Sequence, residues 1–347
     1  NISKMQNDLG TDLVFLAIRS DKKITIKTAP LIFISAILTH LFGGSAGREG
    51  ASLQLGGSIS TSFSKLFRLD EKDTKILTMC GMSAGFASLF GTPVTAVIFS
   101  MEVLAVGIMY YSAILPCALS AVVAYGIATS FGISKPSFSL LNIPELTIKS
   151  TTQTIILAIA CSILGIIFCV AIKSTGSFAK KIIKNSYLRI FIGGLIIIGL
   201  TYIVGNQDYN SAGMHIINKA IEGHANTEAF ALKILFTAIT LGVGFKGGEI
   251  VPVFFTGSTF GNVFGKLLGL SPSFGAGIGL TSLFCAVTNC PLTSLMLSIE
   301  LFGDSSLPLF IITIAVSYLL SGYYGLYSSQ KIVYSKTKSE YIDANSI

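Results

Sequence analysis

The sequence predicts an all-α, polytopic integral membrane protein with an inverted-topology repeat, whose broken helices meet near the midplane of the bilayer. Three observations lead to this fold class. The chain of 347 residues is 51% hydrophobic and 12% charged, with a mean hydropathy of +0.73, whereas a soluble domain is about 25% charged. Apolar runs recur along its whole length. Two glycine-rich breaks, each with a glutamate, interrupt these runs at equivalent places.

The apolar runs have the lengths of helices that cross or partly cross a bilayer, since a full crossing needs about 20 residues. Several are short or interrupted by glycine and proline, which is typical of the broken helices of transporters. We expect helices over nine runs, at 29–43, 76–90, 93–109, 111–131, 153–172, 190–204, 229–245, 273–288 and 307–322.

The net charge of +7 could indicate nucleic-acid binding, but the basic residues lie in loops between apolar runs. We therefore expect a lipid bilayer and no nucleic acid as partner. Under the positive-inside rule, the basic clusters at 19–27, 173–189 and 331–338 mark cytoplasmic ends. The loop 65–75 carries both signs of charge, so its side is left open.

We expect four segments along the chain. Residues 1–28 are polar, contain no visible signal peptide, and should form a cytoplasmic loop and the end of a helix whose start is missing. Residues 29–131 form a first, incomplete transmembrane repeat, and 132–335 form the second. Residues 336–347 form a polar C-terminal tail.

The repeat is visible residue by residue. Glu49 precedes Pro93 by 44 residues (93 − 49), and Glu249 precedes Pro291 by 42 (291 − 249). Each proline is followed at the same spacing by a threonine, a serine and a glutamate; these are Thr95, Ser100 and Glu102 in the first copy and Thr293, Ser298 and Glu300 in the second. Agreement at this level predicts two structurally equivalent halves, and hence glycine breaks that face one site.

The first break, Gly43–Gly50, places Arg48 and Glu49 at the start of an apolar run. Charge is costly there, and each glycine costs a helix about 1 kcal/mol. Glycine lets backbone N–H groups face a ligand, and a helix that begins there directs its positive end to the same place, which suits a small anion. Glu49 could occupy such a site when ionised and leave it when protonated, which would make it a gate.

The second break, Gly244–Pro252, contains Glu249. Instead of contributing to an anion site, this break could be a glycine-rich interruption of a helix that only relieves close packing, with Glu249 paired to Lys246 in the loop. Phe254 and Phe255 could line an anion path with their positive ring edges, or could be core aromatics. Glu102 and Glu300 end equivalent helices, where a carboxylate most simply reaches water or caps a neighbour.

Other chemistry finds little support in the sequence. The histidines are scattered, so no metal site is expected. No nucleophile elbow, Walker A loop or dinucleotide fingerprint is present, so we expect no catalytic residue, no cofactor and no enzyme. Six cysteines lie in or beside apolar runs without CxxC spacing and should be small core residues: Cys80, Cys117, Cys161, Cys169, Cys285 and Cys290.

Four motifs together resemble the CLC chloride channel and transporter family, over residues 1 to about 335. They are Gly47-Arg48-Glu49-Gly50 with Gln54, the segment from Gly91-Thr92-Pro93 to Glu102, the segment Gly248–Pro252, and Gly325-Leu326-Tyr327-Ser328. The resemblance implies a homodimer in which each subunit has its own anion pathway. It places the dimer face on helices near 93–129 and 291–322.

The resemblance also implies roles for single residues. Glu49 matches the external gating glutamate, Tyr327 matches the tyrosine that closes the inner side of the central site, and amides near Ile250 match those that hold the anion. The expected anion-binding set is Gly47, Arg48, Gly50, Gly248, Ile250, Val251, Phe255 and Tyr327. The family's first glycine-serine anion motif would precede Asn1, so we expect part of the pore to be missing from this sequence.

Two departures from the family pattern decide the expected activity. Val103 replaces the inner proton-transfer glutamate of chloride/proton exchangers, as it does in channels. Glu249 adds a carboxylate to the central motif, which resembles the fluoride-exporting branch, although that branch often has threonine at the position of Val251. We expect fluoride/proton antiport with Glu49 and Glu249 handling protons, in a cell membrane, most simply a bacterial plasma membrane. A chloride channel or chloride/proton exchanger is the alternative, and a membrane-embedded enzyme or scaffold is a remote one.

Overall fold

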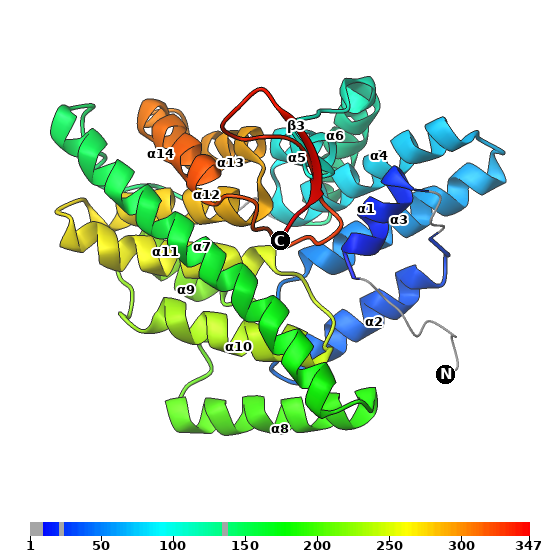
Figure 1. Ribbon diagram of the computed structural model, residues 1–347, viewed down its shortest axis with the longest axis horizontal. Coiled ribbons are helices and arrows are strands. Elements are labelled where there is room, and N and C mark those ends of the chain that lie inside the picture. The colour runs from blue at the N-terminus through cyan, green and yellow to red at the C-terminus, as the bar shows by residue number, and fades with distance from the viewer. Residues whose placement is uncertain (1–9, 21–23, 134–137) are drawn as a thin grey trace. The chain divides into compact units, whose positions relative to one another are not determined.

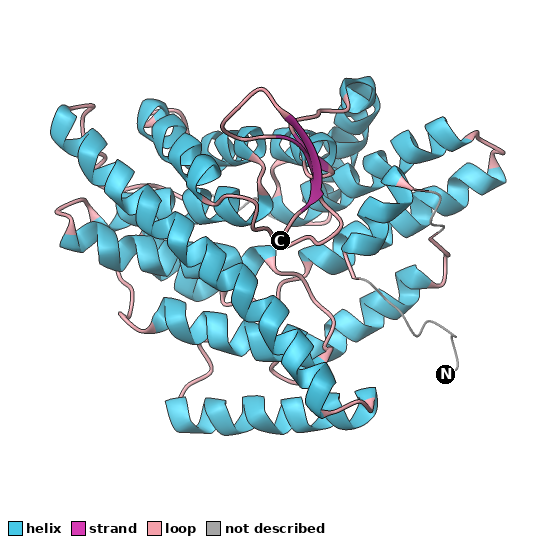
Figure 2. Cartoon of the chain, viewed as in Figure 1, coloured by secondary structure: helices cyan, strands magenta, loops and turns pink. Residues whose placement is uncertain are grey.

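The computed structural model describes residues 10–20, 24–133 and 138–347, and within these ranges it contains fourteen α-helices, one 3-10 turn (η1, Tyr111–Ala113) and three short strands (Figure 2). The predicted, mostly helical fold class is confirmed. By their contacts the described residues fall into two compact units. One lies within Asn1–Ser35, Glu49–Pro136 and Tyr327–Ile347, and the other within Ala36–Arg48 and Ser137–Leu326.

The first unit is built around one long helix, α4. It contains α1 (Asp12–Arg19), the first half of α2 (Thr28–Leu41), α3 (Glu49–Leu66), α4 (Glu71–Phe90), α5 (Pro93–Glu102) and α6 (Ile114–Ser130) (Figure 1). α4 packs against α1, α3, α5 and α6. The contact with α3 is close because a Cβ atom on Gly56 would lie 2.1 Å from the Gly81 carbonyl oxygen, and small residues allow helix backbones in membranes to approach.

A small sheet completes the first unit. β1 (Ala105–Val106) pairs in parallel with β2 (Lys331–Tyr334), and β2 pairs antiparallel with β3 (Tyr341–Asn345). The Gln330 side chain donates to the Val103 carbonyl oxygen over 2.9 Å. The sequence analysis assigned 336–347 only as a polar tail, and the structure places β3 within it. Strands of two to five residues are too short to show a usable alternation of polar and apolar side chains.

The second unit contains eight complete helices among its described residues. They are α7 (Ile148–Ile182), α8 (Ser186–Val204), α9 (Met214–Ile221), α10 (Ala229–Val243), α11 (Ile250–Leu267), α12 (Pro272–Thr288), α13 (Pro291–Phe302) and α14 (Leu307–Leu320). α7 runs along α10, α12 and α14 (Figure 1). The core of the second unit includes four fully buried side chains, those of Leu157, Phe274, Ile278 and Phe310.

Two expectations in this unit are corrected. α7 continues to Ile182, where a basic loop was predicted from residue 173, because small residues at its end pack on α10: a Cβ atom on Gly242 would lie 2.9 Å from the Thr175 Cγ2 atom. α9 forms within the segment 206–227, where the sequence analysis expected no helix. Ile216, Ile217 and Ile221 bury one face of this short helix, which is amphipathic and too short to raise a hydropathy signal.

The sequence repeat is also a structural one. In each unit a pair of tightly packed helices is followed by a short helix that begins at proline: α3, α4 and α5 in the first, α11, α12 and α13 in the second. The turns agree in detail. Gly91 and Asn289 end α4 and α12 at φ 65° and 58°, and Thr92 and Cys290 follow at φ −122° and −118°.

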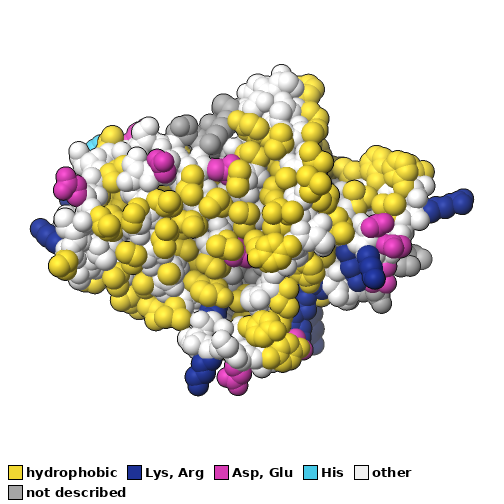
Figure 3. Space-filling model, turned by 90° about the horizontal axis from the view of Figure 1, so that it is seen from above, with side chains coloured by type: hydrophobic (Ala, Val, Ile, Leu, Met, Phe, Trp, Pro, Cys, Tyr) yellow, Lys and Arg dark blue, Asp and Glu magenta, His cyan; other side chains and the backbone are white. Residues whose placement is uncertain are grey.

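The outer helices expose apolar side chains. Among the described residues, three helical segments are long and apolar enough to cross a membrane: Tyr111–Ser130, Ile148–Ile182 and Ser186–Val204. Figure 3 shows hydrophobic side chains over much of the face that it draws. Tyr202 on α8 is 88% exposed, which a lipid bilayer would tolerate better than water. The six cysteines are buried and free, as predicted for core residues.

Candidate functional site

The two glycine breaks meet in the second unit. The N–H group of Gly47 donates to the Gly248 carbonyl oxygen, and the N–H group of Gly248 donates to the Gly47 carbonyl oxygen, each over 2.8 Å. Each glycine lies just before a helix, because α3 begins at Glu49 and α11 begins at Ile250. The prediction that the two breaks come together therefore holds for these two backbone segments.

The bridge depends on the absence of side chains around it. A Cβ atom on Gly247 would lie 2.4 Å from the Cβ atom of Ala46, and one on Gly44 would lie 2.7 Å from the Thr39 Cγ2 atom. Gly247 does not have a positive φ angle. The requirement for glycine at this position is therefore one of space rather than of backbone conformation.

Helix α10 holds the first break in place. The Ser45 N–H group donates to the Thr240 hydroxyl oxygen over 3.0 Å, and the Ser45 and Thr237 hydroxyl groups are 3.0 Å apart. All three side chains are buried. Buried hydroxyl groups that are hydrogen-bonded in this way fix a loop in one position, since losing a partner would leave a desolvated polar group.

The segment 206–213 holds the other side of this loop. The Asn210 side-chain amide donates to the Gly43 carbonyl oxygen over 2.9 Å, and the Ser211 N–H group donates to the Gly44 carbonyl oxygen over 3.0 Å. The Ser211 hydroxyl group donates to the His40 carbonyl oxygen over 3.3 Å. The first break is thus bound on several sides within the second unit.

Lys233 on α10 is a candidate that the sequence analysis missed. Its side chain is fully buried, and its ammonium donates to the Tyr209 and Ser211 carbonyl oxygens over 3.1 and 2.7 Å. The ammonium also lies 4.9 Å from the centre of the Phe255 ring. The signal was present, because Lys233 is the one charged residue in the apolar run 229–245, and charge in such a run is expensive.

The predicted residues of the second break occupy the start of α11. Ile250, Val251 and Phe255 are buried in its first two turns, and Glu249 is a half-buried residue directly before them. Phe255 packs edge-on against Tyr209, with ring centres 6.2 Å apart, whereas Phe254 packs against Phe284. Burial alone leaves both functions of the aromatic pair open.

The other predicted residues lie in the first unit, apart from Arg48, which is exposed. Glu49 is the first residue of α3 and is 1% exposed, and Gly50 is buried beside it in the helix. Tyr327 is buried, with its ring 4.8 Å from the Phe15 ring. Val103 ends α5 and is fully buried.

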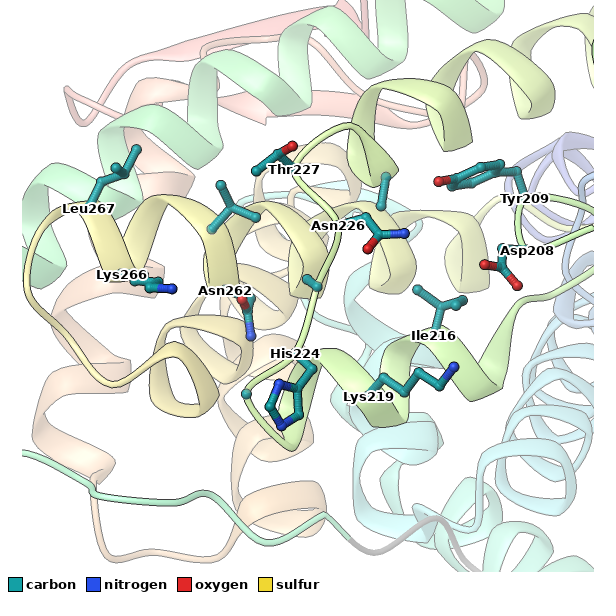
Figure 4. A pocket seen from close by; sticks show the side chains of 14 residues that line it. Asp208, Tyr209, Ile216, Lys219, His224, Asn226, Thr227, Asn262, Lys266 and Leu267 are labelled. Carbon is teal, nitrogen blue, oxygen red and sulfur yellow. The ribbon is translucent and has the colours of Figure 1, made fainter. Parts of the chain in front are cut away.

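Two cavities open into the second unit. One of about 800 Å³ lies between α9, the segment 223–229 and the end of α11; in Figure 4 the Tyr209 hydroxyl group points toward Asn226, and Lys219 and Lys266 lie farther out. The second, of about 850 Å³, has His40 and Asn210 among its lining residues. Both cavities therefore end on residues next to the first break or to Lys233.

Comparison with known proteins gives consistent matches. Residues 2–322 match the family described as voltage gated chloride channel. A protein of Pseudomonas syringae pv. tomato named chloride/fluoride channel protein is 35% identical over 336 residues, which are 95% of this chain and 74% of that protein. The H(+)/Cl(-) exchange transporter ClcA of Vibrio vulnificus is 24% identical over 276 residues, and the match covers 74% of this chain and 58% of that protein.

Solved structures agree with these matches. The crystal structure of a CLC-type fluoride/proton antiporter superimposes with a TM-score of 0.89 at 33% identity, covering 92% of this chain and 82% of the other. A slow cyanobacterial Cl-/H+ antiporter superimposes with a TM-score of 0.78 at 20% identity, covering 90% and 76%. The second likeness shows the fold alone.

Proposed function

Because the chain belongs to the voltage-gated chloride channel family, we propose that it carries small anions across a membrane and exchanges fluoride for protons. One observation carries the proposal: the Gly47–Gly248 bridge joins the two glycine segments that precede α3 and α11. N–H groups at helix starts and positive helix ends attract anions. A backbone segment that leads directly into a helix start therefore suits an anion that has shed its water.

Fluoride is favoured by the relatives and by Glu249. The Pseudomonas relative is named for chloride and fluoride, and the antiporter with a TM-score of 0.89 is described as a fluoride/proton antiporter. Glu249 directly precedes the first turn of α11. A protonated carboxyl group there could donate a hydrogen bond to fluoride, which is the strongest acceptor among the halides, and then release its proton.

The proposed cycle uses two carboxylates. Glu49, buried at the start of α3, is the gate: ionised, it takes the place of an anion, and protonated, it leaves. Glu249 is the second group that binds and releases protons, which move in the direction opposite to the anion. The buried Tyr327 closes the inner side of the central site, and the amides near Glu249 and Ile250 hold the anion. No resident metal or organic cofactor takes part in this cycle.

A passive chloride channel is the second candidate, and Val103 favours it. This side chain is apolar and fully buried at the end of α5, so it cannot transfer a proton. In such a channel Glu49 alone would gate the path. Proton coupling separates the two candidates, because only the antiporter moves protons at a fixed ratio to anions.

We also place the protein in a bacterial plasma membrane as a homodimer. The helix α6 supports an interface, since Leu115, Leu119 and Val122 leave an apolar face that is 60–66% exposed at each residue. Ile311 and Leu319 on α14 are similarly 45–46% exposed. Either lipid or a second copy of the chain would cover these side chains in a membrane.

The test reconstitutes the full chain in liposomes and records fluoride and chloride efflux while a pH dye reports the lumen. Fluoride efflux that drives proton uptake at a fixed ratio, with slow chloride efflux, supports the antiporter. Rapid chloride efflux without proton movement would refute it in favour of the channel. Absence of any anion flux would revive an enzyme or scaffold.

Three variants assign the roles. Glu49→Ala should keep anion movement and lose its coupling to protons. Glu249→Gln should abolish fluoride transport, whereas a chloride channel would retain chloride flux in this variant. Glu222→Gln is the matched control, because Glu222 is exposed at the end of α9 and should leave every flux unchanged.

A further inference from the structure

Lys233 is a buried cation that the proposed cycle does not use. It lies in the middle of the apolar helix α10 and is 0% exposed. Moving an ammonium group from water to the protein interior costs several kcal/mol even after relaxation. Such residues inside membrane proteins are rare and commonly mark an ion path. The neighbours of Lys233 should therefore show what offsets the cost.

The neighbours of the ammonium group include two carbonyl oxygens and an aromatic face. The Tyr209 and Ser211 carbonyl oxygens accept hydrogen bonds of 3.1 and 2.7 Å, and the Phe255 ring centre is 4.9 Å from the Nζ atom. An ammonium group has three donors and no acceptor, and an aromatic face attracts a cation. The surroundings therefore suit the charged form of the lysine.

Two of the groups that contact Lys233, Ser211 and Phe255, belong to segments that adjoin the Gly47–Gly248 bridge. Ser211, whose carbonyl oxygen accepts from Lys233, donates its own N–H group to the Gly44 carbonyl oxygen in the first break. Phe255 belongs to α11, five residues after Ile250, where the helix begins. A Cβ atom on Gly213 would lie 2.7 Å from the Phe255 ring, so the segment 206–213 also presses on this ring.

Other positive charges gather in the same region. Arg48 directly follows Gly47 in the first break, and the Ser211 hydroxyl group donates to the His40 carbonyl oxygen over 3.3 Å. Arg48 is exposed, so water screens it, whereas Lys233 is buried and its field extends farther. Lys233 therefore combines a buried charge with hydrogen bonds to the segment 206–213.

We propose that Lys233 is the fixed cation of the anion path: it positions Phe255 and the segment 206–213, and its charge raises the affinity for small anions at the Gly47–Gly248 bridge. The inference rests on the proposed function. It makes Lys233 a positioning residue that acts on the anion through the electric field. It need not touch the anion.

Two substitutions separate the charge of Lys233 from its hydrogen bonds. Lys233→Gln keeps two N–H donors and removes the charge, and Lys233→Met removes both. In liposome efflux, Lys233→Gln should raise the half-saturating fluoride concentration on the order of tenfold with little change in the maximal rate. Lys233→Met should show the same shift and a lower thermal midpoint. Lys266→Met is the control, because it removes an exposed charge from the other end of α11 and should change neither quantity.

The opposite result is equally clear. If Lys233→Gln had the wild-type half-saturating concentration while Lys233→Met only lost stability, Lys233 would be a structural link and the proposal would be overturned. A wild-type protein that moves no anion would instead refute the proposed function. The role of Lys233 is then decided by calorimetric titration of fluoride into the detergent-solubilised protein, where weaker binding by Lys233→Gln supports it and equal binding overturns it.

Discussion

Replacing Gly247 with alanine tests whether the bridge between the two breaks is needed for transport. The new Cβ atom would lie 2.4 Å from the Ala46 Cβ atom, whereas carbon atoms rest at about 3.5–4.0 Å. The two segments would have to separate by about 1.4 Å to reach that contact distance. Since Gly247 has no positive φ angle, the alanine backbone itself is not strained.

The energetic cost follows from the hydrogen bonds. A separation of that size along the bridge would lengthen its two 2.8 Å bonds to about 4 Å, beyond hydrogen-bonding range. Each bond contributes about 0.5–1.5 kcal/mol, so the loss is roughly 1–3 kcal/mol. A displacement of about 1 Å at a reacting or binding site can reduce a rate by up to about 100-fold. We expect anion flux to fall by at least about tenfold.

The assay compares Gly247→Ala with Gly199→Ala. Gly199 lies on α8, and none of the described atoms outside its own helix would come within 4 Å of its Cβ atom. Alanine there should raise stability slightly, since glycine costs a helix about 1 kcal/mol. Liposome efflux and thermal unfolding in detergent are measured for both. Wild-type flux and stability in Gly247→Ala would refute the reasoning.

Two further predictions concern the turn after α4 and the C-terminal strands. Gly91→Ala should lower the free energy of unfolding by about 1–2 kcal/mol, because Gly91 has a φ angle of 65° that an L-residue adopts at a cost. Gly126→Ala is the control, since it lies in an open part of α6 and should not lower the free energy of unfolding. Thermal unfolding of the two variants tests the prediction. The Lys331 ammonium, 2.9 Å from Asp343, lowers the pKa of that carboxyl below its usual 3.8. The pairing of β2 with β3 should therefore be fully supported above pH 3.8 and weaken as the pH falls through the lower, folded-state pKa, which hydrogen exchange at 341–345 would detect; Asp343→Asn should remove this pH dependence.

The helices that the sequence predicted are those with a continuous apolar run of about 15 residues or more. The runs at 29–43, 76–90 and 229–245 all became helices with ends within about five residues of the prediction. α9 and the strands of the small sheet were not predicted, because each is short and partly polar. The C-terminal end of α7 was not predicted, because its packing on Gly242 is a tertiary contact that cannot be read from the local sequence.

Some features of the candidate site could likewise be predicted from the sequence, and others could not. The repeat of glycine, glutamate and proline predicted that the two glycine breaks face one site, and the structure pairs Gly47 of the first break with Gly248 of the second. The segment 206–213 could not be assigned, because its contacts with Gly43 and Gly44 join residues far apart in the chain. Lys233 could have been singled out as a lone charge in an apolar run, but its partners could not.

The bridge also explains how two carboxylates could share one cycle. Gly47 is two residues before Glu49, and Gly248 is directly before Glu249. Each glycine both donates to and accepts from the other, so a shift of one backbone segment must move the second segment or break both hydrogen bonds. Breaking them costs about 1–3 kcal/mol, which is comparable to a typical coupling energy between two sites. In the proposed cycle, a change of protonation that displaces one segment would therefore be passed to the other, as the exchange of an anion against a proton requires.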